Sequence, residues 1–89
     1  MIEAHRYIFL PETERKIIDI LEETGRPMNV SEIVESIFGE LPYWENKLKR
    51  SATISHLNKM CTKDLLTKTV VDRSNARDCA IYDIREDAE

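Results

Sequence analysis

Apolar residues recur near the start of the chain at the spacing of an amphipathic helix. Ile17, Ile18 and Leu21 fall on one side of such a helix, and charged residues fill the other side. Pro11 suits the first helical position, because its fixed φ and missing N–H are no disadvantage there. Gly25 interrupts the pattern, so a first helix is predicted between Pro11 and Gly25.

A second amphipathic stretch follows after a short link. Residues 28–30 are long enough only for a brief strand or an extended connection. Ser31 is a natural N-cap, so the second helix is predicted to run from there. Gly39 and Pro42 end it. Its buried side consists of Ile33, Val34, Ile37 and Phe38.

The apolar residues of 40–50 follow no single clean period, and this stretch is predicted to be a long turn or a helical turn. In one unbroken helix over 45–63, Leu48 would lie nearly opposite Leu57. We therefore predict that the third helix begins near Ser51, which would be its N-cap. Its buried side then consists of Thr53, Ile54, Leu57, Met60 and Cys61.

The last third of the chain has the pattern of a β-hairpin. Residues 66–71 are rich in Thr and Val, residues 79–84 carry Ile and Tyr, and the polar segment 73–78 between them favours a turn. Residues 85–89 form a short acidic tail. The order of helix, short strand, helix, turn, helix and hairpin predicts one α+β domain over 11–84, with the winged helix-turn-helix arrangement.

Length and composition agree with a single domain. The chain has 89 residues, of which 42% are hydrophobic and 34% charged, so one compact core is expected. No apolar run approaches the ~20 residues that span a bilayer. The first residues lack the apolar region of a signal peptide. The expected location is cytoplasmic, away from membranes.

Charge is strongly segregated along the chain. Residues 1–46 carry ten acidic and four basic side chains, a net charge of -6, whereas residues 47–77 carry eight basic and two acidic ones, a net charge of +6. The remaining residues contribute -4, which is also the net charge of the whole chain. Contact with phosphate requires a local basic face and not a basic protein. The third helix and the hairpin are therefore the candidate nucleic-acid face.

The residues of this face carry a family resemblance. The segment 51–60, SATISHLNKM, followed by Leu65, Leu66 and the hairpin, is similar to the recognition helix and wing of repressors of the multiple-antibiotic-resistance and penicillinase-repressor types. The resemblance spans 11–84 and implies a DNA-binding transcriptional regulator, a repressor, with double-stranded DNA as its partner. Three features depart from the family: Asp64 stands where Gly is usual, the connection over 39–50 is longer, and no long helix follows the wing.

A polar and basic helix face can enter a major groove ~12 Å wide and reach base edges. The predicted base readers are Ser55, His56 and Lys59. Lys49 and Arg50 are expected to contact phosphates just before the helix, and Ser51 with the free N–H groups at the helix start is expected to hold another. The wing residues expected to reach a flanking backbone or minor groove are Arg73, Asn75 and Arg77.

Several of these side chains also fit structural roles. His56 lies at the border of the buried arc and fits a core-edge histidine. Lys59 fits a solvated helix face, and Arg73 fits a charge that keeps a hairpin tip soluble. Tyr43 and Trp44 are predicted to close the core from one side. A second functional class is a winged-helix protein interaction module within a larger assembly, which the acidic first half of the chain favours.

No pattern in the sequence favours an enzyme, a cofactor or a metal site. Glu22 and Glu23 lie on a solvated helix without a neighbouring base, and two glycines cannot build a glycine-rich phosphate loop. Cys61 and Cys79 do not have the spacing of zinc ligands. We expect reduced thiols in the core, with a disulfide or a redox role as the alternative.

A homodimer is expected, because one winged helix reads only a few base pairs and regulators place two of them about 34 to 36 Å apart. With no long helix after the wing, the candidate contact is the N-terminal segment 1–10. The alternative is that this segment folds onto its own core or pairs with the wing. The apolar residues of the expected contact are Tyr7, Ile8, Phe9 and Leu10, together with Tyr43 and Trp44.

Overall fold

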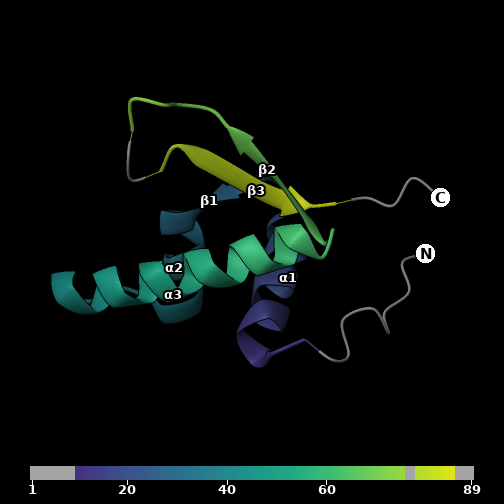
Figure 1. Ribbon diagram of the computed structural model, residues 1–89. Coiled ribbons are helices and arrows are strands. Elements are labelled where there is room, and N and C mark those ends of the chain that lie inside the picture. The colour runs from purple at the N-terminus through teal and green to yellow at the C-terminus, as the bar shows by residue number, and fades with distance from the viewer. Residues whose placement is uncertain (1–9, 76–77, 86–89) are drawn as a thin grey trace.

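The computed structural model of the protein describes residues 10–75 and 78–85, which form three helices and a three-stranded antiparallel sheet (Figure 1). The elements in chain order are α1 (Glu12–Thr24), β1 (Met28–Asn29), α2 (Val30–Phe38), α3 (Tyr43–Thr62), β2 (Leu66–Val70) and β3 (Ala80–Ile84). The predicted α+β class is confirmed. This layout of three helices with a small sheet is compatible with a winged helix.

The sheet has β3 in the middle, between β1 and β2. Met28 of β1 pairs with Tyr82 of β3, and Leu66 of β2 pairs with Ile84. The brief first strand and the hairpin predicted from the sequence are therefore confirmed. We call β2, β3 and their connection the wing, and its described turn, residues 71–75, the wing tip. Figure 1 shows the wing tip on the same side of the molecule as the beginning of α3.

Helix α1 ends where the sequence predicts. Gly25 has φ 73°, and its N–H donates a hydrogen bond to the carbonyl of Leu21. This left-handed conformation suits a residue without a Cβ atom, which explains why the helix stops at a glycine. Ile17, Ile18 and Leu21 are buried, as predicted from their helical spacing.

Helix α2 begins earlier than predicted. The N-cap is Asn29 and not Ser31: the Asn29 side chain accepts a hydrogen bond from the Glu32 N–H (2.8 Å), and the Glu32 carboxylate accepts one from the Asn29 N–H (3.0 Å). This reciprocal pair is a capping box, which satisfies two backbone donors at once. The hydroxyl of Ser31 serves another purpose, because it donates to Asp78.

Helix α3 runs unbroken from Tyr43 to Thr62, so the predicted break near Ser51 is wrong. The prediction assumed that Leu48 must face the core together with Leu57. Leu48 is 62% exposed, because the first turns of α3 extend beyond the core, where no other described element covers their apolar side chains (Figure 1). The buried side predicted for the second half of α3 is correct: Thr53, Leu57 and Met60 are buried, and Ile54 and Cys61 are packed against the core.

The end of α3 is capped without glycine. Asp64, which stands where the resemblance leads one to expect Gly, adopts φ 64° and donates its N–H to the carbonyl of Cys61. Asp is among the residues that tolerate this left-handed conformation. The Asp64 carboxylate also lies 3.3 Å from the guanidinium of Arg85, just after β3, which ties the helix end to the end of the sheet.

The core lies where the three helices meet the sheet. Its largest completely buried side chains include Ile17, Leu21, Ile33, Leu57 and Met60. Cys61 and Cys79 pack at its edge as free thiols, in agreement with the expectation of reduced core cysteines. Burial raises the pKa of the Cys61 thiol, which keeps this side chain protonated and less nucleophilic at neutral pH.

Candidate nucleic-acid interface

The side of α3 that faces away from the core forms one continuous solvent-exposed strip. Its residues are Trp44, Lys47, Leu48, Ser51, Ala52, Ser55, Asn58, Lys59 and Thr62, all of which are exposed. No carboxylate occurs in α3 after Glu45, although the chain has 17 acidic residues. We call this strip the α3 face. Its charge is positive, because its only ionisable side chains are lysines.

Two of the predicted base readers, Ser55 and Lys59, lie on the α3 face. Together with Asn58, Thr62 and Lys63 they line a shallow open depression near the end of the helix. Short hydroxyl and amide side chains beside a longer lysine can donate and accept hydrogen bonds to base edges. The structure thus brings these two residues together on an accessible surface.

The third predicted reader, His56, points elsewhere. Its Nδ1 lies 2.8 Å from Oε2 of Glu14 on α1, and Oε1 of Glu14 lies 3.4 Å from Nζ of Lys63. The Glu14 side chain is only 1% exposed, so the imidazole and the ammonium group supply the partners that a buried carboxylate requires. His56 therefore has the core-edge role that the sequence left open.

Arg50 also has a structural role in the fold. Its guanidinium, 12% exposed, donates to the hydroxyl of Ser31 at 2.7 Å and lies 3.4 Å from the Asp78 carboxylate. Ser31 in turn donates both its N–H and its hydroxyl to Asp78, at 3.2 and 2.8 Å. Partial burial would raise the pKa of Asp78, but the hydrogen bonds from Ser31 and the charge of Arg50 outweigh it and lower this pKa. The cluster joins α3 and α2 to Asp78, which lies in the wing just before β3.

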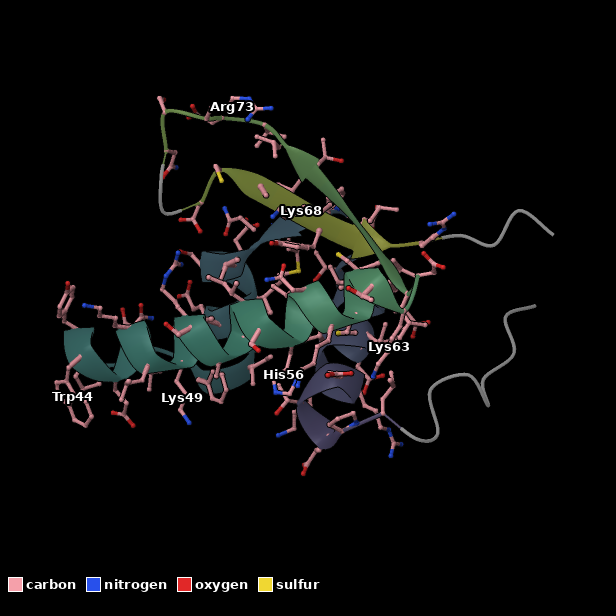
Figure 2. The ribbon with its side chains drawn as sticks, viewed as in Figure 1. Trp44, Lys49, His56, Lys63, Lys68 and Arg73 are labelled. Carbon is pink, nitrogen blue, oxygen red and sulfur yellow. The ribbon has the colours of Figure 1, made fainter. Side chains whose placement is uncertain are left out.

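Two further predictions depended on the expected helix start. Ser51 is not an N-cap and cannot present free N–H groups to a phosphate, because it lies in the middle of α3, where each N–H bonds to the carbonyl four residues earlier. Lys49 lies with its Nζ 4.9 Å from the centre of the Phe38 ring, a cation–π contact between α3 and α2. Figure 2 shows Lys49 and His56 on the same edge of α3.

The wing adds positive charge beside the α3 face. Arg73 is exposed at the wing tip and Lys68 is exposed on β2, and Figure 2 shows both along the wing. Asn75 is exposed, and its side-chain oxygen accepts a hydrogen bond from the Asp78 N–H (3.0 Å), which shapes the turn. Arg77 lies outside the described residues.

Two features of the structure differ from what the sequence pattern predicts, the burial of Glu14 and the exposure of Tyr43 and Trp44. Glu14 is buried, and the signal was present, because Glu14 precedes Ile17 and Ile18 by three and four residues and so shares their side of α1. Tyr43 and Trp44 were predicted to close the core from one side, and this prediction is wrong. Their side chains are 76% and 64% exposed. No local signal distinguishes an aromatic pair that packs from one that a projecting helix leaves in solvent.

Comparison with protein-family models, with curated protein sequences and with solved structures finds no match for this chain. Within residues 10–75 and 78–85, no group of three or more His, Cys, Asp or Glu side chains could hold a metal ion. No helix in the described part of the chain has the length and apolar character needed to cross a membrane.

Proposed function

We propose that the protein is a regulator of transcription, acting as a repressor, that binds double-stranded DNA with α3 in the major groove and the wing against the flanking backbone. The observation that carries this proposal is the α3 face, which presents lysines and short polar side chains and no carboxylate in a chain of net charge -4. A helix 10–12 Å across fits a groove ~12 Å wide. Lys68 and Arg73 on the wing supply positive charge for phosphates beside that groove.

Within this proposal the side chains divide into two classes. Ser55 and Lys59 are the base-reading candidates, while Lys47 and Arg73 are candidates for phosphate contacts; Lys49 lies off the α3 face, against Phe38. Arg50 acts indirectly, because its guanidinium is held by Asp78 and Ser31. A homodimer on two half-sites remains part of the proposal. Of its expected contact, residues 7–9 lie outside the described residues, Leu10 packs against the core of its own domain, and Tyr43 and Trp44 are exposed.

The proposal is tested by fluorescence anisotropy with labelled duplexes, first a random-sequence duplex and then a site selected from a random pool. Lys47→Ala and Arg73→Ala should each lower the slope of log affinity against log salt by ~0.9 on both duplexes. Ser55→Ala and Lys59→Ala should cost about 1 to 3 kcal/mol on the selected site and little on random DNA. Lys16→Ala, which removes an exposed lysine of α1, is the matched control and should change neither quantity.

The alternative is a winged-helix module that binds another protein. The specific observation in its favour is the exposed aromatic pair Tyr43 and Trp44. If the intact protein binds no duplex even at low salt, DNA binding is ruled out and this alternative takes its place.

A further inference from the structure

The first two turns of α3 expose an unusual amount of apolar surface. Tyr43, Trp44 and Leu48 are 76%, 64% and 62% exposed, on a helix end that projects past the other helices (Figure 1). Large apolar side chains grouped on a monomer surface commonly mark a binding site. The sequence places no acidic residue near them in α3 except Glu45.

Trp44 and Leu48 lie on the same strip as the candidate base reader Ser55. At ~100° per residue, Trp44, Leu48, Ser51 and Ser55 fall within an arc of ~60°. At 1.5 Å per residue, Trp44 and Ser55 are separated by roughly 16 Å along the helix. This length matches about five base pairs at a rise of ~3.4 Å. An α3 helix that places Ser55 in a major groove therefore turns Trp44 and Leu48 toward the same DNA.

The surroundings of this patch favour DNA over a second copy of the chain. Lys47 is exposed beside it, and Glu45 in the first turn is the only carboxylate of α3. Two exposed aromatic side chains offer roughly 300 Å² of surface. A stable protein interface buries about 800 Å² per partner. An apolar patch flanked by lysine instead matches a groove edged by phosphates, in which the thymine C5-methyl group is the apolar feature.

We infer that the beginning of α3 reads thymine, with Trp44 and Leu48 in contact with thymine methyl groups and Lys47 on the adjacent backbone. This inference rests on the proposed function and extends it from a general DNA-binding face to specific contacts. It predicts that the preferred site contains thymines about three to five base pairs from the bases that Ser55 reads.

Replacement of thymine by deoxyuracil tests the inference, because it removes only the C5-methyl group. In the selected duplex, deoxyuracil at one or two positions should weaken binding of the intact protein about fourfold per methyl, which corresponds to ~0.8 kcal/mol. With Leu48→Ala, deoxyuracil at the position that Leu48 contacts should no longer weaken binding. With Trp44→Ala, deoxyuracil at the position that Trp44 contacts should no longer weaken binding. Tyr43→Ala is the matched control: it removes a neighbouring exposed aromatic that lies ~100° around the helix, and the fourfold effect should persist.

Trp44 also gives a direct signal, because it is the only tryptophan of the chain. Adding the selected duplex should quench its fluorescence and protect it from acrylamide. If the duplex binds but Trp44 stays fully accessible, or if Leu48→Ala retains the fourfold effect, the inference is wrong while the proposed function stands. If Trp44→Ala instead converts a dimer into a monomer in light scattering, with deoxyuracil sensitivity unchanged, the patch is an interface between copies and the inference is also wrong. Absence of all duplex binding would overturn the proposed function and this inference with it.

Discussion

Glu14 illustrates how a single buried charge links two helices. Its carboxylate is 1% exposed on α1 and lies 2.8 Å from His56 and 3.4 Å from Lys63, both on or just after α3. A buried carboxylate without partners would be strongly unfavourable, so these contacts fix how α1 and α3 pack. His56 and Lys63 are themselves partly exposed, which limits the cost of losing their partner.

Glu14→Ala should destabilise the protein by about 1 to 3 kcal/mol, because it removes the hydrogen-bond acceptor of His56 and leaves a small cavity. The change would be measured as a shift of the urea denaturation midpoint at constant m-value. Glu12→Ala, at an exposed position two residues earlier, should stay within about 0.5 kcal/mol of the original protein. Equal effects of the two substitutions would contradict the role assigned to Glu14.

At the scale of elements, the residues at which α2 and α3 begin determine how far the α3 face extends. The capping box of Asn29 and Glu32 begins α2 directly after β1, with no intervening loop. The early start of α3 at Tyr43 adds two turns that extend past the core and carry Trp44 and Leu48 into solvent. Without that extension the α3 face would end near Ser51, as the sequence pattern had predicted.

Ser51→Ala tests whether α3 is continuous in solution. In a helix interior, replacing an exposed serine by alanine should stabilise the protein by about 0.5 kcal/mol, because alanine has the higher helix propensity. At an N-cap the same change would destabilise it by about 1 kcal/mol. Thermal unfolding followed by circular dichroism therefore gives opposite signs for the two structures, and we expect a higher Tm. Ser36→Ala, at an exposed position inside α2, should give a similar small increase.

At the scale of the whole molecule, Asp78 connects the wing to the helices. It accepts hydrogen bonds from Ser31 at the start of α2 and pairs with Arg50 in the middle of α3. These three side chains from three segments thus add to the sheet pairing and core packing that hold the wing beside α3. Under the proposed function, Arg50 would therefore act on DNA binding through the placement of the wing and not through contact with a phosphate.

Asp78→Asn should reduce stability at pH 7 by about 1 to 3 kcal/mol. Because the folded pKa of Asp78 is lowered, its stabilising contribution is complete above the unfolded value of about 3.9 and is lost as the pH falls through the folded pKa. The stability difference between the original protein and the variant should therefore shrink on acidification below about pH 4. Urea unfolding from pH 7 to pH 2 measures this difference, with Asp19→Asn on the exposed side of α1 as control. A difference that does not change with pH would show that the Asp78 charge is unimportant.

The sequence by itself determined the elements whose residues interact locally. Helical spacing identified the buried sides of α1, α2 and the second half of α3, Gly25 marked a helix end, and the alternation of strands and polar turn marked the wing. Charge segregation likewise indicated which face carries the lysines. These features follow from interactions between residues close in the chain, which a pattern records directly.

Only the tertiary structure decided the features that depend on distant residues. The role of His56 was settled by Glu14, 42 positions earlier, and that of Arg50 by Asp78, 28 positions later. Tyr43, Trp44 and Leu48 are exposed because they lie on the part of α3 that extends past the core, although their side chains are apolar. Periodicity assumes that every apolar residue of a helix faces the same core, and this assumption fails where a helix is longer than the surface it packs against.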